Sequence, residues 1–186
     1  MKSEVFLVVL LLNGLTMLPS LAQSKFMTRT GSINFFSATP IEDIDARNQQ
    51  VGAAVDVQSG QVAFTVPMKS FQFPKSLMQE HFNENYVESE KYPKATFSGR
   101  LVNWTAATLP ATGAQPVQVE GDLTIHGVTK RVRVPGTLEK QGNQLLVKSK
   151  FAVAPADYNI EIPALVRSQI AKSVDVTVNL ACTPAP

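Results

Sequence analysis

Apolar and polar residues alternate along most of the chain, which is typical of β-strands that bury one face. In GQVAFTVPMKSF, the apolar side chains of Val62, Phe64, Val66 and Met68 alternate with Ala63, Thr65 and Pro67. The same alternation recurs in VQVEGDLTIHG, RVRVPG, QLLVKSKFAVA and SVDVTVNLAC. Turn residues separate these runs, at Ser59-Gly60, His126-Gly127, Gln141-Gly142-Asn143 and in TAATLPATGAQP. Strands joined by short turns predict an all-β fold, either an antiparallel sandwich or a closed barrel.

Two segments interrupt the alternation and predict one or two short helices. Thr39 before Pro40 has the order of a cap followed by a first-turn proline, so TPIEDIDARNQQ is expected to hold a helical turn. The second segment, 75–90, has helical spacing until Tyr92-Pro93 stops it.

The first residues have the character of a secretory signal. Lys2 precedes an apolar run, and small residues at Ser20 and Ala22 favour cleavage after Ala22. The apolar run is too short for a membrane span of about 20 residues. We therefore expect a signal peptide at 1–22, one domain at 23–181, a short tail at 182–186, and a periplasmic or secreted protein without a stable membrane span.

Composition narrows the function classes further. The net charge is +2 and the basic residues form no cluster, so nucleic acid is not an expected partner. The single cysteine, Cys182, excludes a disulfide within the chain, so the hydrophobic core must provide the stability. We interpret Cys182 as an inert thiol in the tail.

The predicted helix carries the densest polar group of the chain. Glu80, Glu84 and Glu88 recur every four residues and are interpreted as one solvated acidic face. His81 and Glu84 are too few ligands for a metal site, and none is expected. An apolar stripe lies on the other face, at Leu77, Met78, Phe82 and Tyr86, and either packs on the sheet or covers an opening.

Catalytic chemistry has little support in the sequence. His126 lies at a predicted turn without a neighbouring nucleophile or acid, and no G-x-S-x-G or glycine-rich phosphate loop is present. No catalytic residue and no cofactor is therefore expected. An eight-stranded barrel can fill its interior with side chains or hold one apolar ligand, and alternation alone does not separate these two states.

Two segments resemble the YceI-like family. VEGDLTIHGVTKRVRVP is similar to that family's G-x-L-T-[IL]-H-G-V-T-K-x-V hairpin, and LMQEHFNENYVESEKYPKATFSG to its helical stretch and following strand. Weaker similarity extends over about 26–180. The resemblance implies a lipocalin-like antiparallel barrel of about eight strands whose tunnel holds a polyisoprenoid or an isoprenoid quinone, in a bacterial periplasmic or secreted protein.

The chain departs from the family pattern near its start. Many members begin with a strand of the form D…HS…F, whereas this chain has Phe35-Phe36 followed by the acidic turn TPIED. The departure leaves open whether the same end of the tunnel is open and whether the ligand has the same head group, while the barrel itself is still expected.

The leading hypothesis is a non-enzymatic binding protein for a long apolar lipid. Its expected ligand-binding residues point inward from the strands or lie near the mouth on the helix: Phe64, Val66, Met78, Phe82, Phe97, Leu101, Leu123, Ile125, Phe151 and Val153. A second hypothesis is a structural or interaction protein of the cell envelope with a filled barrel, and a third is an enzyme. The oligomeric state, with a homodimer as one option, stays open.

Overall fold

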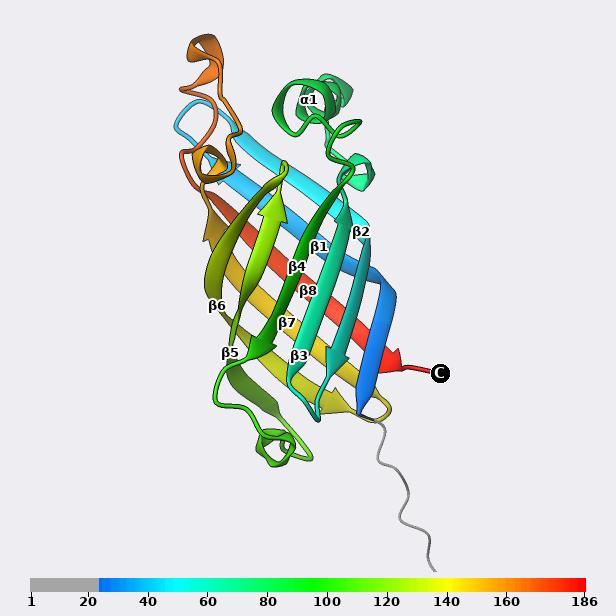
Figure 1. Ribbon diagram of the computed structural model, residues 1–186. Helices are drawn as coiled ribbons and strands as arrows, with labels where there is room; N and C mark the ends of the chain where they lie inside the picture. The colour runs from blue at the N-terminus through cyan, green and yellow to red at the C-terminus, as the bar shows by residue number, and fades with distance from the viewer. Residues whose placement is uncertain (1–23) are drawn as a thin grey trace, which may run out of the picture.

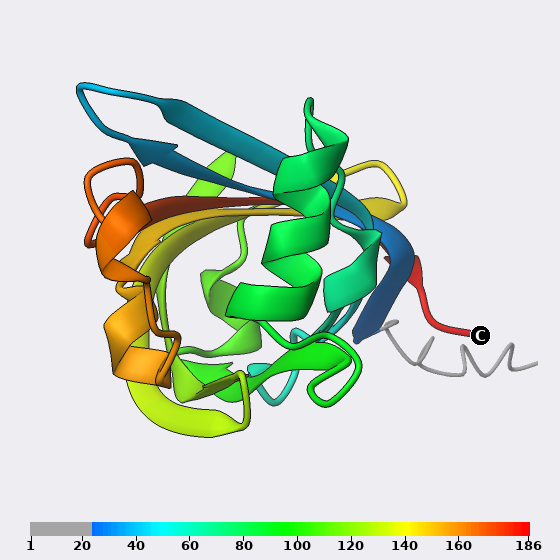
Figure 2. The ribbon, with the colours of Figure 1, turned by 90° about the horizontal axis from the view of Figure 1, so that it is seen from above.

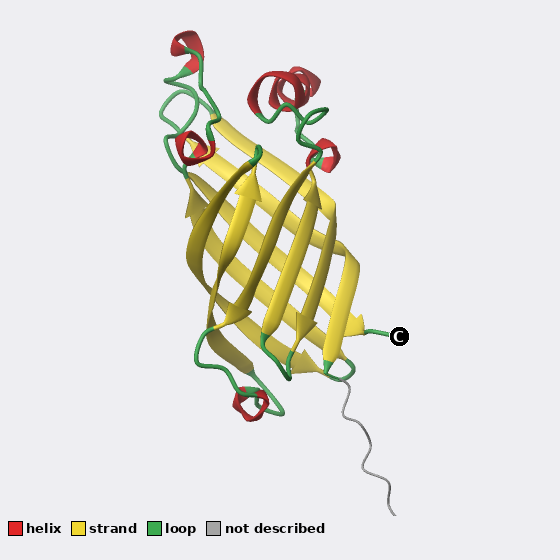
Figure 3. Ribbon diagram, viewed as in Figure 1, coloured by secondary structure: helices red, strands yellow, loops and turns green. Residues whose placement is uncertain are grey.

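The computed structural model describes residues 24–186, so the expected signal peptide lies outside the described residues. Eight antiparallel strands close into a barrel in chain order, with β8 returning to pair with β1 (Figures 1 and 3). The strands are β1 (Lys25–Ala38), β2 (Asp43–Asp56), β3 (Gln61–Pro67), β4 (Lys94–Leu101), β5 (Ala114–Ile125), β6 (Val128–Gln141), β7 (Gln144–Val153) and β8 (Val174–Pro184). The predicted all-β, lipocalin-like barrel is confirmed, and the closed barrel rather than the sandwich is the observed form.

The helical elements are short and lie at the two ends of the barrel (Figure 3). Helix α1 (Ser76–His81) continues into the π-helical turn η2 (Phe82–Tyr86). The remaining elements are single 3-10 turns, η1 (Met68–Ser70), η3 (Ala106–Thr108), η4 (Pro155–Tyr158) and η5 (Ala164–Val166). No helix within 24–186 is long and apolar enough to cross a membrane.

The strand register places the alternating apolar side chains on the inner face. Phe64 pairs with Phe97, and Phe97 pairs with Leu123, so one inward row crosses three strands. Val119 and Val134 continue the inward set onto β6. Side chains directly opposite each other share one face of a sheet, and all of these residues line the cavity, so the shared face is the inner one.

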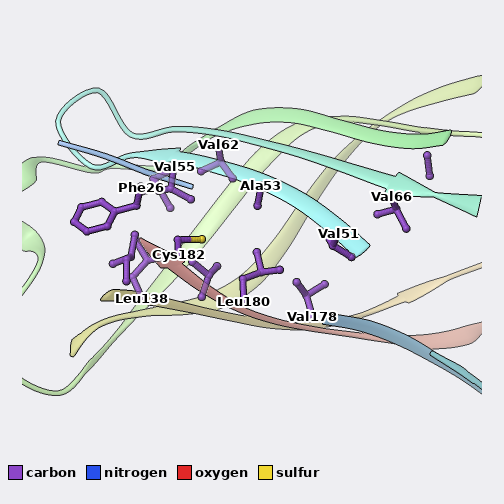
Figure 4. Packing of buried hydrophobic residues seen from close by; sticks show 14 of the residues in the cluster. Phe26, Val51, Ala53, Val55, Val62, Val66, Leu138, Val178, Leu180 and Cys182 are labelled. Carbon is purple, nitrogen blue, oxygen red and sulfur yellow. The ribbon is translucent and has the colours of Figure 1, made fainter. Parts of the chain in front are cut away.

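One end of the barrel is packed solid. Val55, Leu138 and Leu145 are almost completely buried there, and Phe26 and Leu180 pack among them (Figure 4). The loop between β4 and β5 covers this end, where the Trp104 Nε1–H donates a 2.8 Å hydrogen bond to the Val57 carbonyl. This packed end forms a floor beneath the rest of the barrel interior.

The other end is covered by loops instead of being filled by strand side chains. Seen from above, α1 lies over the opening of the barrel, and the segment that holds η4 and η5 lies at one side of it (Figure 2). The chain therefore forms a cup with a solid floor and a roof of two separate segments.

Three local expectations need correction. No helical turn forms at Thr39, because its hydroxyl accepts hydrogen bonds from the Ile41 and Glu42 amides and closes a tight turn between β1 and β2. The expected helix over 75–90 ends at Tyr86. The expected tail at 182–186 is mostly strand, because β8 runs to Pro184 and Cys182 is fully buried opposite Leu145.

Candidate functional site

A cavity of about 330 Å³ occupies the barrel above the floor. Leu101, Leu138 and Val55 line its lower end, and side chains of every strand line its wall. The lining is almost entirely aliphatic or aromatic. Such a chamber offers dispersion contacts and removal of apolar surface from water, with few hydrogen bonds, so it suits a hydrocarbon chain.

All ten residues proposed from the sequence line this cavity. Strands contribute eight of them, and Met78 and Phe82 come from the helical segment above: Phe64, Val66, Met78, Phe82, Phe97, Leu101, Leu123, Ile125, Phe151 and Val153. The structure thus brings them together around one space, and their contact with a ligand remains a prediction.

A pair of glycines widens the wall at mid-height. Gly99 and Gly121 face each other on β4 and β5, and the Phe97 ring lies over both. A Cβ atom at Gly121 would lie 2.4 Å from the Ser98 carbonyl oxygen and 2.7 Å from Phe97 Cζ. The absent side chains therefore allow the Phe97 ring to lie against the wall of the cavity.

Four phenylalanines join the helical segment to the barrel at the mouth. The Phe82 ring lies 5.6 Å from Phe35 of β1, 5.5 Å from Phe71 and 5.1 Å from Phe73, measured between ring centroids. All four rings line the cavity. Aromatic pairs at these distances contribute about 0.5–1.5 kcal/mol each beyond burial, so this cluster both holds the roof and forms part of the apolar lining.

Only three of the four residues in the expected apolar stripe of the helical segment face the cavity. Met78, Phe82 and Tyr86 line the cavity, but Leu77, the fourth member of the expected apolar stripe, is 59% exposed. Leu77 lies next to Met78 on a single turn, so only one of these two neighbours can face inward. Burial raises the pKa of the Tyr86 hydroxyl above its usual value.

His126 holds the two parts of the roof together. Its Nδ1–H donates to the Tyr158 carbonyl of η4 at 3.1 Å, and its Nε2 lies 2.6 Å from Glu88 Oε2, just beyond η2. The ring also meets the edge of Tyr92 at 4.5 Å between centroids. Of the expected acidic face, Glu80 and Glu84 are exposed, whereas Glu88 is partly exposed and is bound to His126.

The second roof segment brings lining residues that the strand alternation did not reveal. Ile160, Ile162, Val166 and Ile170 follow β7 and line the cavity. The segment is anchored to β1 by the Ala171 amide, which donates a 2.9 Å hydrogen bond to Ser37 Oγ. The apolar character of these four lining residues is the only sequence signal for them, and their spacing has no regular period.

Sequence reasoning also missed three of the four aromatic residues at the mouth as lining residues. Phe71 and Phe73 alternate around Gln72, but they are out of phase with the even-numbered inward residues of β3, because η1 intervenes. The period of β3 alone could therefore not have found them. Phe35 belongs to the departure from the family pattern and lines the mouth, while its neighbour Phe36 is 39% exposed.

The mouth carries polar lining residues that include two ionisable side chains. Glu42, His81 and Gln169 contribute to it, and the Glu42 Oε1 atom lies 2.6 Å from the Lys75 Nζ atom. Lys75 itself is outside the lining and its side chain is 66% exposed. Within the described residues, no group of three or more His, Cys, Asp or Glu side chains could hold a metal ion.

A family model described as the YceI-like domain matches residues 20–182. The chain belongs to the YceI-like family. The match covers most of the sequence, including all eight strands except the last residues of β8, and agrees with the resemblance of the TIHGVTK hairpin. No curated protein matches the chain.

Solved structures share this fold at low sequence identity. A polyisoprenoid-binding domain from Saccharophagus degradans superposes with a TM-score of 0.75 at 17% identity, covering 88% of this chain and 99% of that one. BcnA of Burkholderia cenocepacia gives 0.70 at 20% identity, with coverage of 82% and 96%. The Campylobacter jejuni YceI protein gives 0.61 at 13% identity, with coverage of 76% and 85%.

Proposed function

We propose that this YceI-like chain is a periplasmic or secreted binding protein that holds a long apolar lipid, a polyisoprenoid or an isoprenoid quinone, inside its barrel. The observation that carries the proposal is the apolar cavity of about 330 Å³ between a solid floor and a covered mouth. The polyisoprenoid binding named for the Saccharophagus degradans domain supports the same ligand class.

The energetics favour an occupied chamber. An empty dry cavity of 330 Å³ would lower the stability of the folded protein by about 8 kcal/mol, at roughly 24 cal/mol per Å³. A bound hydrocarbon offsets this cost, and each buried methylene contributes about 0.8 kcal/mol. A protein whose barrel had only a structural role would gain stability from bulkier inward side chains, as at the floor. The hollow upper barrel therefore favours the binding protein over the filled barrel.

Binding without catalysis fits the polar groups that the structure does contain. His126 is 11% exposed and both of its ring nitrogens are engaged, one by a backbone carbonyl and one by Glu88. A general base needs a nitrogen free to reach a substrate proton. We therefore assign His126 to the architecture of the roof.

Native mass spectrometry of protein purified from its own host tests the proposal. The expected spectrum shows an added mass that solvent extraction identifies as an isoprenoid. Protein that is lipid-free from its host, and that takes up no polyprenol after delipidation, would refute the proposal.

A further inference from the structure

We infer that the mouth of the cavity selects isoprenoids with an uncharged head group and rejects phosphorylated ones, and that Glu42 is the residue that sets this preference. The inference rests on the proposed function and adds the chemical class of the head group. It follows from which charged side chains reach the lining and which do not.

Only three ionisable side chains of the types Asp, Glu, His, Lys and Arg occur in the described lining, and none is a free cation that faces inward. Lys148 has an exposed side chain and lies between the inward neighbours Val147 and Ser149 on β7, so it lies on the outer face of the strand. The other two are Glu42 and His81 at the mouth. Hydrogen bonds to lining backbone groups can serve a hydroxyl or carbonyl, but a phosphate needs charge compensation on entering an apolar chamber.

A cation beside the Glu42 end of this lining is already paired. Lys75 Nζ lies 2.6 Å from Glu42 Oε1, and the Glu42 side chain is 25% exposed, less than that of Lys75. A phosphate held at the mouth would lie beside the carboxylate and would have to compete with it for the ammonium group. Arg167 and Lys172 of the second roof segment are exposed and contribute no part of the lining.

Glu42 is held in place by the turn that replaces the expected helix. Thr39 Oγ1 accepts from the Glu42 amide at 3.1 Å and donates to the Glu42 carbonyl at 2.9 Å. Both bonds fix the backbone of Glu42 at the start of β2, so its carboxylate is positioned by local structure. The acidic turn that distinguishes this chain from the family pattern thus supplies the selecting charge.

The inference is tested with two ligands that share one tail, farnesol and farnesyl monophosphate. Each competes for the cavity against the fluorescent probe N-phenyl-1-naphthylamine, at one fixed pH and ionic strength. Wild-type protein is expected to bind farnesol at least about tenfold more tightly, the order expected when an anion must enter beside a partly buried like charge.

Two variants assign the preference to Glu42. Glu42→Gln frees Lys75 and is expected to tighten the binding of farnesyl monophosphate relative to that of farnesol by about tenfold. The double variant Glu42→Gln with Lys75→Gln removes both charges and is expected to lose most of that gain. Glu80→Gln, on the exposed face of α1, is the control and leaves both affinities unchanged.

Each result has a defined meaning. Equal binding of the two ligands by wild-type protein, or a Glu42→Gln variant with the wild-type preference, would overturn the inference and leave the proposed function intact. If neither ligand displaces a bound probe, and longer neutral polyprenols also fail, the proposed function fails and the inference fails with it.

Discussion

A tryptophan placed at mid-height of the cavity should block long isoprenoids without unfolding the barrel. Val132 of β6 is suited to this test because it lines the cavity, pairs with Gly121 and lies between the mouth and the floor. In Val132→Trp the larger side chain would extend into open space, so we expect a stability change below about 1 kcal/mol. A filled barrel would instead lose about 1–3 kcal/mol from overpacking at the same position.

The expected loss of binding follows from the length of tunnel beyond the plug. From Val132 to Leu138 at the floor, β6 spans six residues, or about 20 Å of strand at 3.3 Å per residue. If the plug displaces only four carbons of the ligand, it removes about 3 kcal/mol at 0.8 kcal/mol per carbon. This energy corresponds to a Kd that rises more than about 100-fold.

The assay is displacement of N-phenyl-1-naphthylamine by a long-chain polyprenol, together with thermal unfolding of each variant. Arg133→Trp is the matched control, because Arg133 is the next residue on β6 and its side chain is exposed on the outer face. Wild-type affinity in Val132→Trp would refute the tunnel as the binding site. Unfolding of Val132→Trp would refute the hollow interior.

Three further predictions concern the architecture around the cavity. Burial raises the pKa of the Cys182 thiol to about 11 from 9.0. Native protein at pH 9 should therefore not react with Ellman's reagent until guanidinium unfolds it. The free energy of unfolding should fall as the pH rises from 9 towards 11, because only the unfolded thiol ionises there. A rapid native reaction would contradict this burial. His126→Ala should lower the free energy of unfolding by about 1–3 kcal/mol, because two hydrogen bonds are lost. His81→Ala is the control and should not lower it. Equal unfolding midpoints in urea for both variants would show that the roof contacts of His126 contribute nothing to stability. Gly121→Ala should lower the free energy of unfolding by about 1–3 kcal/mol in the same urea titration, because its Cβ would lie 2.4 Å from the Ser98 carbonyl oxygen. An unchanged midpoint would mean that β4 and β5 can move apart freely.

The barrel could be predicted because its signal is local. Strands β3, β5, β6, β7 and β8 alternate, and a turn of two or three residues such as His126-Gly127 fixes the antiparallel register of the next strand. The inward set that includes Phe64, Leu123 and Phe151 follows directly from that period.

The roof could not be predicted in the same way, because it is held by contacts between residues far apart in the sequence. The bond between His126 and Glu88 spans 38 residues, and that between Ser37 and Ala171 spans 134. Neither pair has a periodic signature. The turn at Thr39 was misread for a related reason, since a hydroxyl that caps a helix can equally close a tight turn, and the neighbouring strand decides between them.

The central claim is that the barrel interior holds an apolar chain, and a crystal structure of protein purified from its native host tests it most directly. We expect continuous density for one chain with regular methyl branches, running from the phenylalanines around Phe82 at the mouth down to the floor at Leu101. The head group is expected beside Glu42. A cavity filled by ordered water, or by side chains that have collapsed into it, would contradict the account.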